Sequence, residues 1–112
     1  MDNSEIEKAI PAITVGIVEY VANSVVKKTI LKKPTGNINA YSFDNGEGWA
    51  ERTTPFDNYL QIIEGNADIV INGVSHTLQM GESIVIPAHE SISIKPNDRF
   101  KMIVTVIKSA YE

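Results

Sequence analysis

Cysteine is absent from the 112 residues of this chain. Disulfides, thiolate nucleophiles and cysteine-ligated zinc sites are therefore excluded. Histidine is scarce as well, with only His76 and His89 present, whereas a transition-metal site usually needs three or four good ligands. Lack of disulfides is compatible with the reducing cytoplasm, and a cytoplasmic protein is expected.

Clustered positive charge and long hydrophobic runs are also missing. The net charge of −4 argues against nucleic acid or an anionic membrane as a partner, because both reward clustered Lys and Arg. The pairs Lys27-Lys28 and Lys32-Lys33 alternate with apolar residues, which predicts a solvated strand face. No segment approaches the roughly 20 apolar residues of a membrane span, and the acidic N-terminus lacks the basic start of a signal peptide.

The chain length predicts one domain, and a hydrophobic content of 43% is ordinary for a globular protein. We divide the chain into an N-terminal segment, residues 1–23, that packs on or near a barrel domain, residues 24–112. Ser4 and Glu7 have the spacing of a capping box, which favours a short helix that ends before Pro11.

Beyond residue 23 the pattern is that of short β-strands. Turn-forming residues recur about every eight residues, and no long helical period appears. Asn72-Gly73 has the sequence of a two-residue type I′ hairpin turn, which is the best local signal in the chain. We predict an all-β sandwich or small barrel of about nine strands. The clearest strand segments are residues 24–31, 37–43, 58–64, 67–71, 74–78, 82–87, 91–95 and 100–108.

The stretch from Gly46 to Gly65 has the spacing of the first cupin motif. That motif is Gly, five residues, His-x-His, three or four residues, Glu, six residues, Gly. In this chain the glycines and the intervals match. Arg52 and Thr54 stand at the positions of the two histidines, and Asn58 stands at the position of the glutamate.

The second cupin motif is matched less fully. Gly81 is followed after five residues by Pro87, as the motif requires, but His89 replaces its glycine. Ile92 stands at the position of its histidine, and Pro96 at that of its asparagine. Over about residues 27–108 the chain resembles small single-domain cupins of the RmlC-like group. The resemblance implies a cupin-type double-stranded β-helix, also described as a jelly-roll barrel.

In metal-dependent cupins the four motif positions bind one divalent ion inside the barrel. In this chain a permanent cation, Arg52, would repel such an ion, and Ile92 offers no lone pair. Thr54 and Asn58 are weak neutral oxygen donors that would suit only a hard cation with other ligands. We therefore expect no metal and no cofactor.

Strand alternation puts Arg52 and Thr54 on one face, and the resemblance makes that face the barrel interior. An inward Arg52 is costly to bury unpaired. We therefore predict a pocket for a small anionic or polar molecule, in which Arg52 clamps a carboxylate or phosphate. The further residues of this predicted site are Thr54 and Asn58 as hydrogen-bond partners, Trp49, Tyr41 and Tyr59 as aromatic wall, and also Ile92 and His89.

Other interpretations stay open at this point. Arg52 could instead escape to solvent at the barrel mouth, with the aromatic residues serving as packing or dimer contacts. The resemblance also allows a metal-independent isomerase or epimerase, although spacing reveals no acid–base pair and assigns no catalytic residue. His76 and His89 could form such a pair or be ordinary surface residues.

A third alternative is a structural or regulatory module that pairs with itself. The resemblance implies a homodimer, and an edge strand such as residues 24–31 is a natural place for pairing, because an edge leaves backbone groups unmatched.

Overall fold

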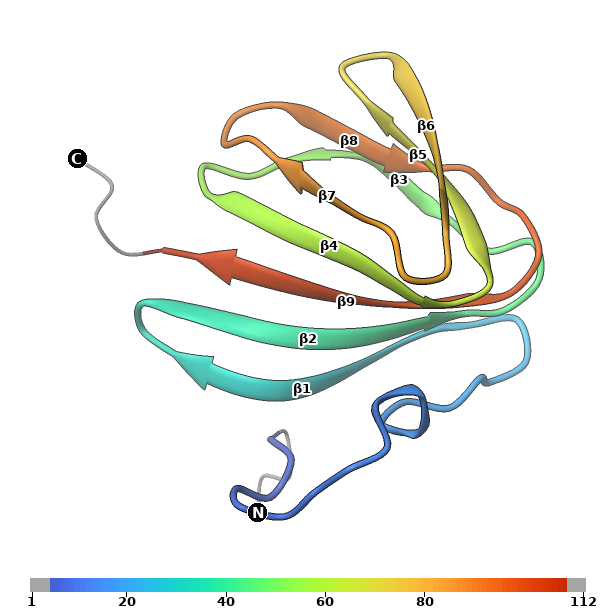
Figure 1. Cartoon of the computed structure of the whole chain (residues 1–112). Coiled ribbons are helices and arrows are strands. Elements are labelled where there is room, and N and C mark those ends of the chain that lie inside the picture. Colours follow the sequence, from blue (N-terminus) through green and yellow to red (C-terminus); the bar gives the residue numbers. More distant parts are fainter. Residues whose placement is uncertain (1–4, 109–112) are drawn as a thin grey trace.

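The computed structural model describes residues 5–108. Within this range nine β-strands form two antiparallel sheets that face each other (Figure 1). The five-stranded sheet has the order β1-β2-β9-β4-β7, and the four-stranded sheet has the order β3-β8-β5-β6. The predicted all-β fold class is confirmed.

The strands follow one another closely along the chain. Their bounds are β1 Val25–Lys33, β2 Gly36–Phe43, β3 Trp49–Thr53, β4 Asp57–Glu64, β5 Asn66–Ile71, β6 Val74–Gln79, β7 Ser83–Ile86, β8 Ser91–Ile94 and β9 Phe100–Ile107. The Asn72-Gly73 turn joins β5 to β6 as predicted, and both of its residues have positive φ angles, as a type I′ turn requires. The described residues contain no helix of the length and apolarity that crossing a membrane would take.

The helix predicted before Pro11 is not formed within the described residues, although Ser4 lies outside them. Instead, the Glu5 carboxylate accepts a hydrogen bond of 2.6 Å from the backbone N–H of Lys32. This part of the chain lies along the edge strand β1, so its polar groups serve that edge rather than a helix N-terminus (Figure 1). The helical turn that does occur is the short 3-10 helix Thr14–Gly16.

The N-terminal segment is held at one end of the outer face of the five-stranded sheet. The Lys101 ammonium donates to the carbonyl oxygen of Val15 at 2.7 Å, and the Ser42 hydroxyl donates to that of Glu19, also at 2.7 Å. Val18 is buried beneath these contacts, with 2% of its surface exposed. Both buried donors therefore find main-chain acceptors in the segment.

Asp44, in the loop after β2, ties the segment to the other end of the chain. Its carboxylate accepts hydrogen bonds from the backbone N–H of Asn23 at 2.8 Å and from the Arg99 guanidinium at 2.8 Å. The backbone N–H groups of Asn23 and Asn45, together with Arg99, lower the pKa of Asp44 below its ordinary value. These bonds favour the ionised carboxylate.

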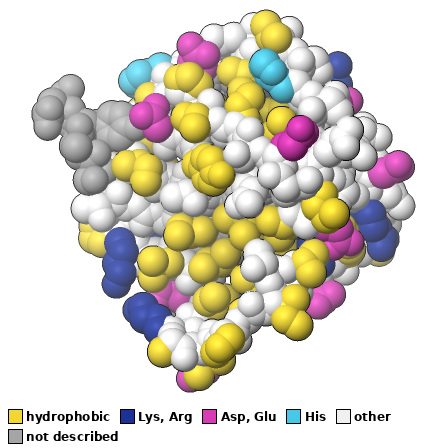
Figure 2. Space-filling view, viewed as in Figure 1, with side chains coloured by type: hydrophobic (Ala, Val, Ile, Leu, Met, Phe, Trp, Pro, Cys, Tyr) yellow, Lys and Arg dark blue, Asp and Glu magenta, His cyan; other side chains and the backbone are white. Residues whose placement is uncertain are grey.

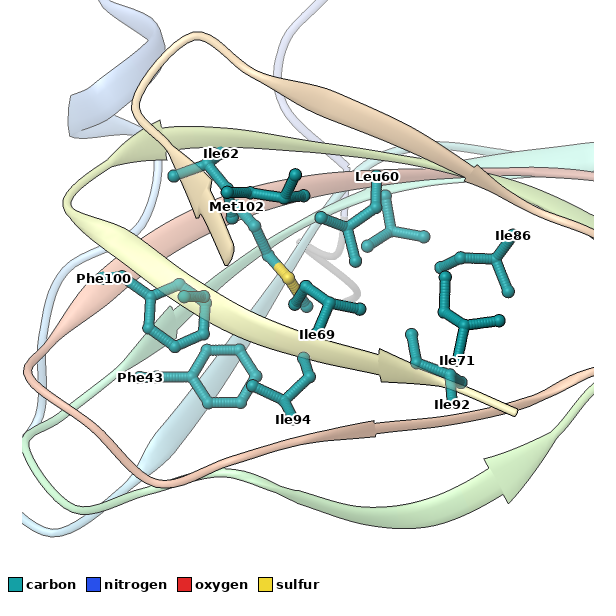
Figure 3. Close-up of a cluster of buried hydrophobic side chains, with 13 residues drawn as sticks. Phe43, Leu60, Ile62, Ile69, Ile71, Ile86, Ile92, Ile94, Phe100 and Met102 are labelled. Carbon is teal, nitrogen blue, oxygen red and sulfur yellow. The ribbon is translucent and has the colours of Figure 1, made fainter. Parts of the chain in front are cut away.

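The hydrophobic core fills the half of the barrel where β2 ends and β9 begins. Phe43 and Phe100 are opposite each other in the ladder and stack with their ring centroids 4.4 Å apart. Ile62 and Met102 lie beside them, and the four-stranded sheet adds Ile69 (Figure 3). Along β2 and β4, however, the inward side chains become polar toward the other end of the barrel. That change leaves room for a cavity.

Candidate functional site

A partly open cavity of about 220 Å³ occupies the half of the barrel that the core does not fill. Seven strands contribute side chains to it, and Thr54 and Glu90 add two more from the loop after β3 and the turn before β8. The side chains that line it are Lys27, Asn37, Asn39, Tyr41, Trp49, Arg52, Thr54, Asn58, Leu60, Ile86, Glu90, Ile92, Val104 and Val106. A cavity of this size suits a small molecule.

Arg52 is exposed to solvent and lines this cavity. Its strand β3 pairs with β8, so that Arg52 lies opposite Ile92. The guanidinium carbon sits 4.0 Å from the centroid of the Trp49 ring, a cation–π contact. Among residues 5–108 the guanidinium has no ion pair and no hydrogen bond. Arg52 thus faces both the cavity and the solvent at its mouth.

Trp49 separates the cavity from the core. Its ring meets Tyr41 edge-on with the centroids 5.0 Å apart, and it meets Phe43 at 5.5 Å. Burial raises the pKa of Tyr41, and the nearby Arg52 offsets part of that rise. Trp49 is the single tryptophan of the chain, so its fluorescence reports directly on the cavity.

Thr54 and Asn58 are bonded to each other and to the loop between β3 and β4. The Asn58 amide donates to the Thr54 hydroxyl at 3.1 Å and to the Phe56 carbonyl oxygen at 2.9 Å. The Thr54 hydroxyl in turn donates to the same carbonyl at 3.0 Å. A hydroxyl has a single proton, and Thr54 donates it to the loop carbonyl. Thr54 therefore stabilises this loop, whereas the Asn58 side-chain oxygen can still accept a hydrogen bond from a ligand.

Two residues of the predicted site, Tyr59 and His89, are not among those that line the cavity. Tyr59 is 42% exposed on the outer face of the sheet, because it alternates with Asn58 along β4. His89 is exposed in a turn, where φ is +72° and its backbone N–H donates to the Thr54 carbonyl oxygen at 2.7 Å. His76 lies on β6 rather than in this turn, and it does not line the cavity either.

Four polar or charged lining residues were missed at the sequence level. Asn37 and Asn39 follow from the alternation of β2, which puts them on the face of Tyr41. The Asn39 amide donates to the Asn37 side-chain oxygen at 2.9 Å. The places of Lys27 and Glu90 in the cavity depend on pairing between strands, which the sequence does not reveal. Lys27, for example, lies opposite Tyr41 in the pair of β1 and β2.

A metal does not fit this site. Arg52, Thr54, Asn58 and Ile92 do line one cavity, but they bring a cation, two neutral groups that are hydrogen-bonded to each other and an alkyl chain. Within the part of the chain that the structure describes, no three His, Asp or Glu side chains come together to form a metal-binding group. The cavity chemistry therefore rests on the side chains themselves.

Comparisons with known proteins identify the fold. No family profile and no curated protein matches the chain. A conserved protein of unknown function from Streptococcus pyogenes has 23% sequence identity and a TM-score of 0.88, over 96% of this chain and 94% of that one. A cupin superfamily protein from Desulfitobacterium hafniense has 23% identity and a TM-score of 0.84, over 93% and 94%.

A third similar structure is a cupin 2 conserved barrel domain protein from Leptotrichia buccalis. It has 26% identity and a TM-score of 0.80, and the match covers 84% of this chain and 46% of that one. Together these likenesses show that the chain has the cupin-type double-stranded β-helix fold, as the motif spacing predicted. Sequence identities this low show a shared fold and do not show a shared activity.

Proposed function

We propose that this cupin-fold chain is a small-molecule-binding protein whose barrel cavity takes an anionic or polar ligand. The observation that carries the proposal is the Arg52 guanidinium. It lies at the cavity mouth, 4.0 Å over Trp49, and has no acidic partner within residues 5–108. A cation that the protein itself leaves uncompensated favours an anionic group on a ligand.

The residues around Arg52 also favour a ligand with an anionic group. The contact with the Trp49 ring and the rigid, planar fork of the guanidinium both reduce the side-chain entropy that is lost when a carboxylate binds through two hydrogen bonds. Lys27 lines the same cavity and adds positive charge. The deeper wall is apolar, formed by Leu60, Ile86 and Ile92 among others. The ligand that fits best has a charged end and a compact apolar body.

Binding fits the cavity better than catalysis does. An isomerase or epimerase needs an acid and a base that face each other across the site. The titratable side chains that line this cavity are Lys27, Tyr41, Arg52 and Glu90. Because burial raises the pKa of Tyr41, its phenol stays protonated at neutral pH. A histidine that could act as base lies elsewhere, at His76 or His89.

Replacing Arg52 by alanine is expected to weaken ligand binding by about tenfold or more, because a charge-assisted two-point contact is lost. Binding is measured by thermal shift and by Trp49 fluorescence with a panel of acetate, benzoate, 4-methylpentanoate, leucine and inorganic phosphate. Lys95→Ala is the matched control, since it removes an exposed positive charge outside the cavity. Unchanged affinity in the Arg52 variant, or no stabilisation of the wild-type chain by any compound tried, contradicts the proposal.

We also propose that two copies pair through the outer face of the five-stranded sheet. A row of side chains crosses all five strands on this face, and its members are Leu31, Ile38, Thr105, Tyr59 and Val85. Figure 2 shows hydrophobic side chains gathered on the side of the molecule where β2, β9 and β4 run in Figure 1. An apolar face of this extent favours association.

The charges beside this face favour a second copy as the occupant. Strand β1, at one edge, carries Lys28 and Lys33 on this face and no carboxylate of its own. At the other edge, β4 and β7 carry no Lys or Arg, and Asp57 and Glu82 lie there. A two-fold axis that runs along the strands puts β1 of one copy opposite β7 of its partner. Unlike charges then meet on both sides of the apolar row.

Val85→Arg is expected to weaken the dimer about tenfold or more, because it puts an unpaired cation into an apolar contact that faces the partner's lysines. Val74→Arg is the matched control: Val74 is 57% exposed, against 59% for Val85, but lies on β6 of the other sheet. Size-exclusion chromatography with light scattering gives the masses. A wild-type chain that is monomeric at high concentration, or equal effects of the two variants, overturns this dimer.

A further inference from the structure

The cavity mouth holds a carboxylate as well as cations. Glu90 is half-buried and lines the same cavity as Arg52. It directly precedes β8, whose register with β3 pairs Arg52 with Ile92 and Thr53 with Ser91. Glu90 lies two residues before Ile92, which faces Arg52 across the β3–β8 pair, and both Glu90 and Arg52 line the cavity.

Glu90 and Arg52 do not neutralise each other directly. In the described part of the chain no ion pair within 4.0 Å joins them, and the Glu90 carboxylate makes no hydrogen bond to another side chain. Two opposite charges thus border one small cavity with a gap between them. A simple anion in contact with Arg52 would also meet the negative charge of Glu90, which repels it within the same cavity.

We infer that the ligand is a small zwitterion with a compact apolar body, the chemical class to which the apolar α-amino acids belong. Its carboxylate binds the Arg52 guanidinium, and its ammonium group binds the Glu90 carboxylate. This inference rests on the proposed function of the cavity and names its ligand class. It uses Glu90, which the binding of an anion alone leaves without a role.

The shape of the cavity agrees with this ligand. An α-amino acid carries both charged groups on one carbon atom, so one end of the molecule satisfies both Arg52 and Glu90 at the mouth. Its side chain then points to the apolar wall, where Leu60, Ile86 and Ile92 line the cavity. All three residues are apolar, so a ligand with a charged or strongly polar side chain is disfavoured there.

The test compares molecules that share one body and differ only in their charges. Leucine carries both groups, 4-methylpentanoate lacks the ammonium group, and 3-methylbutylamine lacks the carboxylate. Phenylalanine and 3-phenylpropanoate form a second matched pair with a larger body. Affinity for the full chain is measured by calorimetry and by Trp49 fluorescence. We expect at least one zwitterion to bind about tenfold or more tightly than its singly charged counterparts.

The Glu90→Gln variant removes the negative charge and keeps the size of the side chain. It is expected to erase the preference for the zwitterion and to improve the binding of the carboxylate that lacks an ammonium group. Glu51→Gln is the control, because Glu51 is an exposed carboxylate beside Arg52 in sequence that does not line the cavity. It should leave the preference unchanged.

The outcomes separate this inference from the function on which it rests. If the singly charged carboxylates bind as tightly as the zwitterions and binding depends on Arg52, the zwitterion inference is overturned and the anion site stands. If no compound of either kind binds at concentrations of about 10 mM, both are overturned. A preference for the zwitterion that survives in Glu90→Gln overturns the role of Glu90. The comparison of matched ligands on the wild-type chain tests the ligand class without any variant.

Discussion

Phe43→Ala is expected to lower the free energy of unfolding by about 3–5 kcal/mol, the largest loss from any single change proposed for this chain. The Phe43 ring is fully buried and stacks on Phe100 at a centroid distance of 4.4 Å. It also supports Trp49, at 5.5 Å. The substitution leaves a cavity that rigid strands on both sides cannot close, so lost packing adds to lost burial.

Urea unfolding followed by circular dichroism measures this loss. Phe43→Leu is the control, because it keeps most of the volume and should cost less than about 1.5 kcal/mol. Trp49 fluorescence of the folded alanine variant should also shift, since the ring of Trp49 loses a neighbour. A loss below 1 kcal/mol in the alanine variant would mean that the stacked pair is not packed as described.

Gly65→Ala is expected to cost about 2–5 kcal/mol, because a strained backbone angle and a steric clash act together. Gly65 joins β4 to β5 with a φ angle of +76°, which disfavours any side chain. A Cβ atom at this position would lie 2.8 Å from the Arg99 carbonyl oxygen and 3.1 Å from the Phe100 Cβ. The backbone of β9 would have to move away to admit it.

Gly73→Ala separates the two causes. Gly73 has a similar φ angle of +81°, but nothing lies within 4 Å of the Cβ that alanine would add. This control should therefore lose only the conformational part, about 1–2 kcal/mol. Both variants are compared by urea unfolding under the same conditions. Equal losses would show that Gly65 is kept for its backbone angle alone and that β9 tolerates the extra methyl group.

The glycine positions were readable in advance because a glycine turn is a local property. Gly46, Gly65, Gly73 and Gly81 all lie between strand segments predicted from the sequence, and all four have positive φ angles. Alternation with period two likewise located most strands. The exception is β3, Trp49–Thr53, whose last four residues are exposed and whose pairing with β8 is irregular between Trp49 and Arg52. A strand without a buried row gives no alternating pattern.

The predicted N-terminal helix is a local signal that tertiary contacts override. Glu7 and Ser4 have the right spacing for a capping box, but a capping box is a weak preference, worth about 0.5–2 kcal/mol. The open edge of β1 offers main-chain donors to the same segment, and Glu5 caps one of them at Lys32. A short helix that buries no apolar face cannot compete with such tertiary contacts.

Residue chemistry and alternation along single strands are enough to predict an all-β chain and the places of most strands and turns. They also show that the four motif positions hold side chains unsuited to a metal. The folded arrangement of the strands is needed to see that Lys27 and Glu90 share a cavity with Arg52, and that Tyr59 faces the outside. The reason is that strand order and register depend on packing between segments far apart in the chain, where β9 comes to lie between β2 and β4.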